Sequence, residues 1–256
     1  MEKLVIVKVG GVVLEDPETL NDFLDHFVAI PGKKILVHGG GRTATQLSTQ
    51  LGIETRMVEG RRITDAETIK VVTMVYGGLI NKNTVAVLQS KGCNALGLTG
   101  VDMNLISAVK RPVGEIDYGL VGDNSAINTF AFSLLLQSGF VPVIAPITHD
   151  THGQLLNTNA DTIASAIAVA LSGIFNVSLV FCFEKAGVLS DPDDNDSVIP
   201  FMNFQMYQDS KQTGTIHSGM IPKLDNSFKA LEMGVEEVII TNAGTLNTTK
   251  GTHLCL

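Results

Sequence analysis

Two lysines stand where a cation has an unusual environment. Lys8 interrupts the apolar run LVIVKV, and Gly10 and Gly11 follow shortly after it. Because an isolated buried ammonium is costly, Lys8 is expected at the carboxyl end of a strand, facing a ligand crevice. Lys223 falls in the first turn of the helix predicted within HSGMIPKLDNSFKALEMG, where the helix dipole disfavours a cation. Both lysines indicate a bound anion, and solvated surface lysines are the alternative.

Three consecutive glycines follow the apolar run ILVH and precede the predicted helix TATQLSTQL. Gly40 and Gly41 would let backbone N–H groups approach a phosphate or carboxylate at the helix N-terminus. The same stretch fits the dinucleotide-binding pattern GxGxxG/A through Gly39, Gly41 and Ala44. That pattern expects an acidic residue at the end of the next strand, whereas Glu59 lies in VEGRRITD, which does not look like a strand end. An anion site, a dinucleotide site and a structural turn all fit these residues.

A third polar group is the segment NTNAD, which precedes an apolar helical pattern. Asn157, Asn159 and Asp161 alternate, so an extended segment would point all three side chains in one direction. Asn and Asp are also good N-caps, and half of the group is expected to cap the helix. His149 and His152 lie three residues apart, but in a turn-rich segment rather than on a helix, so no resident metal ion is expected.

Short apolar runs alternate with helical patterns along the chain. The runs LVIVKV, ILVH, FVPVIAP, VSLVFCF and EVIITN have the continuous hydrophobicity of strands in parallel sheets. A helix is expected over AINTFAFSLLLQ, residues 126–137. The alternation predicts an α/β fold, a three-layer αβα sandwich around a mostly parallel central sheet, with ligands at the carboxyl ends of the strands. Within this single domain of residues 1–256, a boundary is expected near residue 173.

The composition excludes several classes of function. The 256 residues are 45% hydrophobic, which is enough for a substantial core, and the net charge of −8 argues against nucleic acid or an anionic membrane as the partner. Three cysteines without CxxC spacing argue against a disulfide framework and a zinc site, and favour a reducing cytoplasm. Residues 125–148 and 162–183 carry no formal charge, but each divides at a glycine into a helix and a strand pattern. The opening MEKLVIVKVGG has too short an apolar run for a signal peptide.

Taken in order, seven motifs resemble the amino acid kinase family, and in particular its members that phosphorylate N-acetylglutamate. The motifs are KVGG, HGGG, GRRITD, GFVPVIAP, LLNTNAD, GVLSD and GMIPKL. The resemblance implies an ATP-dependent kinase with a carboxylate acceptor in arginine biosynthesis, using ATP with Mg²⁺ and forming a cytoplasmic homodimer. It also implies a lobe for the acyl-amino acid, residues 1–173, and a lobe for ATP, residues 174–256. Kinases of the family that act on carbamate, glutamate or aspartate are alternatives.

The resemblance also implies roles for individual residues. Lys8 and Lys223 match the two lysines that clamp the phosphates, and Asp161 matches the carboxylate that holds these lysines in place. Gly10 and Gly11 are expected to donate N–H groups to the transferring phosphoryl group. The implied substrate-binding residues are Gly40, Gly41, Arg62 and Asn157, with Asn159 beside them. The implied ATP-binding residues are Gly10, Gly11, Glu184, Gly187, Val188, Leu189, His217, Ser218 and Gly219.

Five positions depart from the family's usual residues. Glu184 stands where Asp is usual, and His217 and Ser218 stand where Thr and Asp are usual. Arg42 replaces a common proline after HGGG, and Arg61 replaces a common leucine before the expected arginine. Because arginine binds carboxylates through two parallel hydrogen bonds, these two additions would suit a dicarboxylic acyl group. N-succinylglutamate is therefore an alternative substrate to N-acetylglutamate, unless both arginines point to solvent.

Overall fold

The computed structural model describes residues 1–58, 61–191, 193–216, 220–246 and 250–256. The chain forms two compact units: unit 1 comprises Met1–Ile35 and Ala164–Leu256, and unit 2 comprises Leu36–Ile163. This division differs from the predicted boundary at residue 173. The reason is strand pairing, because β1 (Lys3–Val9) lies parallel to β11 (Asn176–Phe183) and so belongs with the C-terminal residues.

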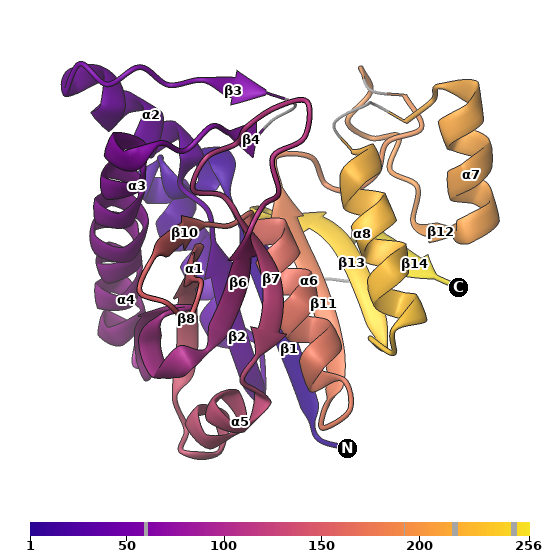
Figure 1. The fold of residues 1–256 in the computed structure, drawn as a ribbon. Helices are drawn as coiled ribbons and strands as arrows, with labels where there is room; N and C mark the ends of the chain where they lie inside the picture. The colour runs from indigo at the N-terminus through magenta and orange to yellow at the C-terminus, as the bar shows by residue number, and fades with distance from the viewer. Residues whose placement is uncertain (59–60, 192, 217–219, 247–249) are drawn as a thin grey trace. The chain divides into compact units, whose positions relative to one another are not determined.

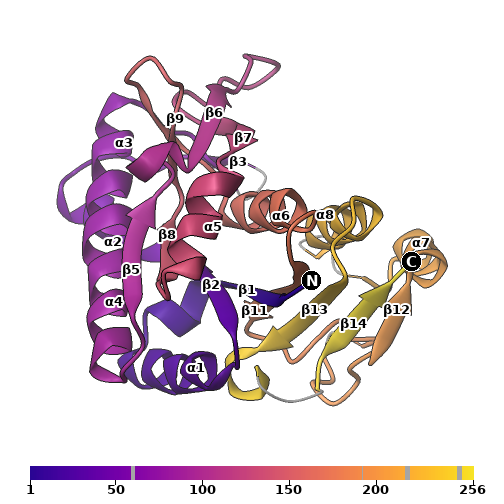
Figure 2. The same cartoon turned by 90° about the horizontal axis from the view of Figure 1, so that it is seen from below.

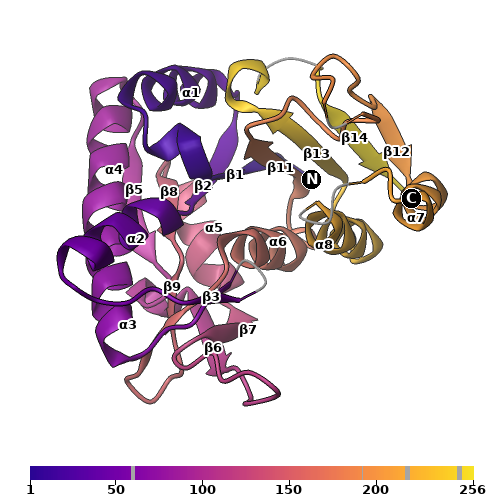
Figure 3. The ribbon, with the colours of Figure 1, turned by 90° about the horizontal axis from the view of Figure 1, so that it is seen from above.

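Unit 1 is built on strands in the order β12-β14-β13-β11-β1. The pairs β1–β11, β11–β13 and β12–β14 are parallel, and only β13–β14 among these neighbours is antiparallel. Helices α6 and α8 cover one face of this sheet, and α1 lies on the other (Figure 3). The elements besides β1 and β11 are η1 (Gly11–Leu14), α1 (Pro17–Ala29), β12 (Phe201–Asn203), α7 (Phe204–Thr213), α8 (Ile221–Glu232), β13 (Glu237–Asn242), η4 (Ala243–Thr245) and β14 (Thr252–Cys255).

Unit 2 contains the parallel strands β2-β8-β5, with α4 and α5 on opposite faces (Figure 2). A second, four-stranded sheet has the order β10-β9-β6-β7, and β3 and β4 form a short hairpin near α2 (Figure 1). The elements are β2 (Lys33–His38), α2 (Gly41–Gln50), β3 (Met57–Val58), β4 (Arg61–Arg62), α3 (Ala66–Val72), η2 (Thr73–Ile80), α4 (Asn81–Ser90), β5 (Ala95–Thr99), η3 (Asp102–Asn104), β6 (Ile106–Lys110), β7 (Gly122–Ile127), α5 (Thr129–Gln137), β8 (Val141–Ala145), β9 (Ile147–His149), β10 (Leu155–Asn157) and α6 (Ala160–Leu171), which continues into unit 1.

The predicted α/β fold with a mostly parallel central sheet and helices on both sides is confirmed, and all five apolar runs form strands: β1, β2, β8, β11 and β13. The helix predicted over residues 126–137 was too long at its start. Residues up to Ile127 belong to β7, which pairs antiparallel with β6. The helix begins after Asn128, whose side chain caps it by accepting a hydrogen bond from the Ala131 N–H (3.1 Å).

Helical structure continues from Ala66 to Ser90 through α3, η2 and α4. Among the described residues, it is the one helix that is long and apolar enough to cross a membrane, judged by length and composition alone. It packs within unit 2 instead, with Val72, Val75 and Leu88 completely buried, as expected of a core helix. Its middle segment η2 is π-helical, a distortion that is frequent at functional sites.

Candidate active site

In unit 1, the two predicted clamp lysines lie over the same aromatic ring. Lys8 is 8% exposed, and its Nζ is 5.6 Å from the ring centroid of Phe183, the last residue of β11. The Nζ of Lys223, in the first turn of α8, is 3.6 Å from the same centroid. Cation–π attraction holds each ammonium at the ring, so two cationic side chains converge at one point. The arrangement therefore suits an anion such as a phosphoryl group.

Gly10 leaves space beside Lys8. A Cβ added at Gly10 would lie 3.0 Å from the Lys8 Nζ. On the neighbouring strand, burial raises the pKa of Cys182 to about 12, and the charge of Lys8 lowers it only in part. The Cys182 thiol is therefore protonated at neutral pH and does not serve as a nucleophile. Gly11 begins η1, so a glycine pair joins the strand that carries Lys8 to a short helix.

The predicted nucleotide-binding segment follows β11 directly. Glu184 is exposed, whereas Gly187 and Val188 are buried and Leu189 is half-buried. The Val188 N–H donates to the Thr252 Oγ1 (2.8 Å), and a Cβ added at Gly187 would lie 2.7 Å from the same oxygen. The loop backbone is thus held against β14. The other predicted nucleotide contacts, His217, Ser218 and Gly219, lie outside the described residues.

In unit 2, the glycine-rich loop joins β2 to α2, as predicted. Gly40 is the N-cap of α2 and has a φ of +153°, which L-amino acids with side chains rarely adopt. A Cβ added there would lie 2.4 Å from the Ile80 Cδ1 and 2.9 Å from the Tyr76 Cδ1. The N-cap residue Gly40 has no side chain to accept hydrogen bonds from the first N–H groups of α2, so these N–H groups suit an anionic ligand.

Arg62 lies buried beside the first turn of α2. Its Nη2 donates to the Gly41 carbonyl oxygen and to the Thr45 Oγ1 (both 2.7 Å), and its Nη1 donates to the Thr55 Oγ1 (3.2 Å). Burial raises the pKa of Tyr76, and the guanidinium of Arg62 opposes this increase. The Arg62 charge and the positive end of α2 therefore lie close together, and a carboxylate bound here would be attracted by both.

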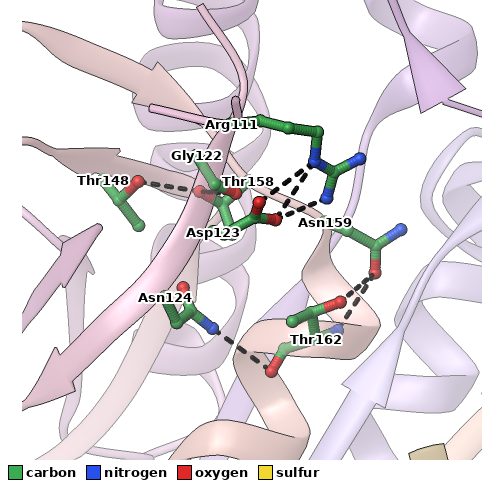
Figure 4. Close-up of polar contacts among 8 residues, drawn as sticks. All are labelled: Arg111, Gly122, Asp123, Asn124, Thr148, Thr158, Asn159 and Thr162. Atoms are coloured by element: carbon green, nitrogen blue, oxygen red, sulfur yellow. Dashed lines mark hydrogen bonds and ion pairs between the residues drawn. The ribbon is translucent and has the colours of Figure 1, made fainter. Parts of the chain in front are cut away.

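The structure gives the members of NTNAD different positions. Asn157 ends β10, and its Nδ2 donates to the Thr64 Oγ1 (3.0 Å). Asn159 caps α6, because its Oδ1 accepts from the N–H and the hydroxyl of Thr162 (3.0 and 3.3 Å; Figure 4). Asp161 lies in the first turn of α6, where the helix dipole favours a negative charge. The predicted capping role therefore belongs to Asn159.

The two additional arginines lie on different elements of unit 2. Arg42 is exposed on the first turn of α2, and Arg61 is half-buried in β4, where it pairs with Val58. Neither position fixes the identity of the acyl group.

The two histidines considered for a metal site have other partners. The Nε2 of His149 contacts the Asn104 Oδ1 (2.8 Å), and the Nδ1 of His152 contacts the Asp150 carbonyl oxygen (2.9 Å). Within the described ranges, no group of three or more His, Cys, Asp or Glu side chains could hold a metal ion.

Sequence reasoning missed two polar or aromatic features near the predicted residues. Phe183 has the pattern of an ordinary apolar strand residue, and only the pairing of β1 with β11, with Val9 opposite Cys182, places it one residue beyond the end of the lysine-bearing strand. Arg111 and Asp123 form a two-pronged ion pair, with the Arg111 Nε 3.2 and 3.1 Å from the two Asp123 oxygens (Figure 4). The sequence does not indicate this ion pair, because the pairing of β6 with β7, which brings the two residues together, is not predicted.

Comparisons with known proteins agree with this geometry. The sequence model of the amino acid kinase family matches residues 3–242. Acetylglutamate kinase of Bacteroides fragilis is 58% identical over 253 residues, which cover 99% of this chain and 97% of that protein. Acetylglutamate kinase of Methanopyrus kandleri is 41% identical over 251 residues, which cover 96% of this chain and 98% of that protein. A Streptococcus mutans crystal structure is similar with a TM-score of 0.78 at 26% identity over 98% of both chains. Carbamate kinase from Giardia lamblia has the same fold, with a TM-score of 0.70 at 14% identity over 99% of this chain and 98% of that one. The family model matches nearly the whole chain, and glycines follow the carboxyl ends of the parallel strands β1 and β2, so the chain belongs to the amino acid kinase family.

Proposed function

We propose that the chain transfers the γ-phosphoryl group of ATP to the side-chain carboxylate of N-acetyl-L-glutamate, forming an acyl phosphate. The observation that carries this proposal is the convergence of Lys8 and Lys223 on the ring of Phe183 in unit 1. Two ammoniums at one point suit a group whose negative charge is spread over several oxygens. The names of the relatives that are 41–58% identical support N-acetylglutamate as the acceptor.

The proposed reaction needs no general base. A glutamate side chain with a pKa of about 4.3 is already ionised at neutral pH and can attack phosphorus directly. What remains is to align two anions and to stabilise the charge of the transferring group. This accounts for candidate residues that are lysines and glycines in unit 1, with Cys182 inert beside Lys8, and glycines and one arginine in unit 2.

Each unit has a proposed part in binding. In unit 1, Lys8, Lys223 and the N–H groups of Gly10 and Gly11 bind the phosphates, and the segment from Glu184 to Leu189 binds the rest of the nucleotide. In unit 2, the loop residues Gly40 and Gly41, with Arg62 and Asn157, bind N-acetylglutamate. Asp161 has, by resemblance, the task of orienting the lysine ammoniums. Mg²⁺ would arrive bound to ATP and neutralise part of the phosphate charge, because Mg²⁺ uses few protein ligands in such sites.

We place the enzyme in arginine biosynthesis as a cytoplasmic homodimer. The pathway and the compartment follow from the proposed reaction and the cysteine usage. Light scattering of the purified chain tests the dimer, and a monomeric mass would contradict it.

The test of the proposed function is trapping of the acyl phosphate. Hydroxylamine converts an acyl phosphate to a hydroxamate, which is measured after incubation with ATP, Mg²⁺ and N-acetylglutamate. Carbamate, glutamate and aspartate serve as competing acceptors, and titration with NAD tests the dinucleotide-binding alternative. Faster turnover of one of these acceptors than of N-acetylglutamate, or binding of NAD without turnover, would overturn the proposal.

A second candidate acceptor, N-succinylglutamate, is favoured only by the two additional arginines. We expect kcat/KM to be higher for N-acetylglutamate. We expect Arg42→Pro and Arg61→Leu to change the ratio of the two kcat/KM values by less than about fivefold, because Arg42 is exposed, Arg61 is only half-buried, and ion pairs of solvent-accessible side chains are weak. Steady-state kinetics with both substrates in the three proteins checks this. A preference for the succinyl substrate that one substitution reverses would instead assign the extra carboxylate to that arginine.

A further inference from the structure

His38 is the last residue of β2, and its imidazole is completely buried. The His38 Nδ1 lies 2.8 Å from the carbonyl oxygen of Gly39, and the Nε2 lies 3.1 Å from the Nδ2 of Asn81, the first residue of α4. Both ring nitrogens therefore have a partner. The His38 side chain joins the start of the glycine-rich loop to the first residue of α4.

Asn81 determines which ring nitrogen carries the proton. Its Nδ2 also donates to the Val143 carbonyl oxygen (2.9 Å), and its Oδ1 accepts from the Nζ of Lys82 (3.2 Å). Turning the amide over would place oxygen against the Val143 carbonyl and nitrogen against the ammonium, so the orientation is fixed. The Asn81 amide therefore donates to the His38 Nε2, which must be unprotonated. The proton is on Nδ1, which donates to the Gly39 carbonyl oxygen.

We propose that His38 is a positioning residue for the substrate: its neutral Nδ1–H tautomer holds the Gly39 carbonyl, so that the N–H groups of the next glycines stay directed at the substrate carboxylate. This inference rests on the proposed function of the loop. The N-cap residue Gly40 has no side chain that could accept a capping hydrogen bond, so the hydrogen bond from His38 to Gly39 is a fixed point immediately before the helix. Rotation of the Gly39–Gly40 peptide would break that bond and turn the Gly40 N–H away.

The surroundings of the imidazole keep it neutral. Burial lowers the pKa of His38 to about 4, the hydrogen bond to Gly39 opposes this, and the charge of Lys82 lowers it further. Lys82 is contributed by α4, and it is held by a bond to the Gly97 carbonyl oxygen of β5 (2.8 Å). β8 contributes the uncharged Val143 carbonyl to this network. The tautomer is therefore constant over the neutral pH range.

Two substitutions separate the two ring nitrogens. In His38→Asn, the amide nitrogen lies where Nδ1 lies and can still donate to Gly39, whereas in His38→Gln the amide lies near Nε2 and contacts only Asn81. We expect His38→Gln to raise the KM for N-acetylglutamate about tenfold, which corresponds to one lost hydrogen bond, and to leave the KM for ATP within about twofold. His38→Asn should keep both KM values within about threefold of the native values.

A purely structural role would give a different result. Both variants would then lose thermal stability, and neither would change one KM selectively. Equal KM changes in the two variants, or equal changes for ATP and N-acetylglutamate, would overturn the proposal.

Nitrogen-15 NMR of the native chain gives a readout independent of activity. The imidazole signals of His38 are identified as those missing from the spectrum of His38→Asn. Their chemical shifts should show Nδ1 protonated and Nε2 unprotonated from pH 6 to pH 9. The opposite tautomer, or titration of His38 in this range, would contradict the inference. Failure of the native chain to phosphorylate N-acetylglutamate would overturn the proposed function, and with it the substrate role of His38, while the NMR result would still report the hydrogen bond to Gly39.

Discussion

Replacement of Lys8 or of Lys223 by alanine should lower kcat about 100-fold or more, because removal of a preorganised charge that stabilises the transition state typically has this effect. The KM values should change much less. In the described geometry both ammoniums lie over the ring of Phe183, so each acts on the same bound group. Charge shifts among the phosphoryl oxygens during transfer, and a fixed cation stabilises that state more than the bound substrates.

The chain offers matched controls for both lysines. Lys3 is an exposed lysine on the same strand as Lys8, and Lys229 is an exposed lysine on the same helix as Lys223. Lys3→Ala and Lys229→Ala change the net charge equally but should leave kcat within about twofold, because exposed charges interact weakly through water. Thermal melting of all four variants shows whether lost activity reflects unfolding. Decreases in kcat below about fivefold for both Lys8→Ala and Lys223→Ala would contradict the proposed clamp.

The sequence predicts the elements that carry these lysines because local patterns determine them. A continuous apolar run ending in Lys8 and two glycines predicts a buried strand followed by a turn, and β1 has that form. A proline in the first turn and Gly234 after the last turn predict the extent of α8, which ends at Glu232. The glycine-rich loop is predicted for the same reason, because glycine permits the backbone conformations that a tight connection from strand to helix requires.

The features that could not be predicted depend on long-range pairing. β6 and β7 lack the continuous apolar pattern of the parallel strands, because they belong to a separate sheet in which more than half of their residues are not buried. The division into units depends on β1 lying beside β11, which are more than 160 residues apart. The role of Asn81 depends on hydrogen bonds with residues of two other elements, β2 and β8, although its sequence position shows only the start of a helical turn.

Replacement of Gly40 by alanine should lower kcat/KM for N-acetylglutamate about 100-fold, because a displacement of about 1 Å at a substrate-positioning group has effects of this size. Two independent observations lead to this expectation. The φ of +153° is strained for alanine, and the new methyl group would lie 2.4 Å from the Ile80 Cδ1 and 2.9 Å from the Tyr76 Cδ1. Tyr76 and Ile80 are buried in η2, so the loop must move away from the helix to make room.

Gly78→Ala is the matched control for this substitution. Gly78 lies on η2 between Tyr76 and Ile80, its φ is not in the positive range, and a Cβ added there meets nothing within 4 Å. Alanine at that helical position should leave kcat/KM within about twofold and keep or raise the thermal midpoint, because alanine favours helix over glycine. Gly40→Ala should instead lower the thermal midpoint by several degrees, as expected for about 1 kcal/mol or more of strain. Isothermal titration with N-acetylglutamate separates the two causes of lost activity: weaker binding to a folded Gly40→Ala protein supports displacement of the loop, whereas native affinity with normal turnover would show that Gly40 does not position the substrate.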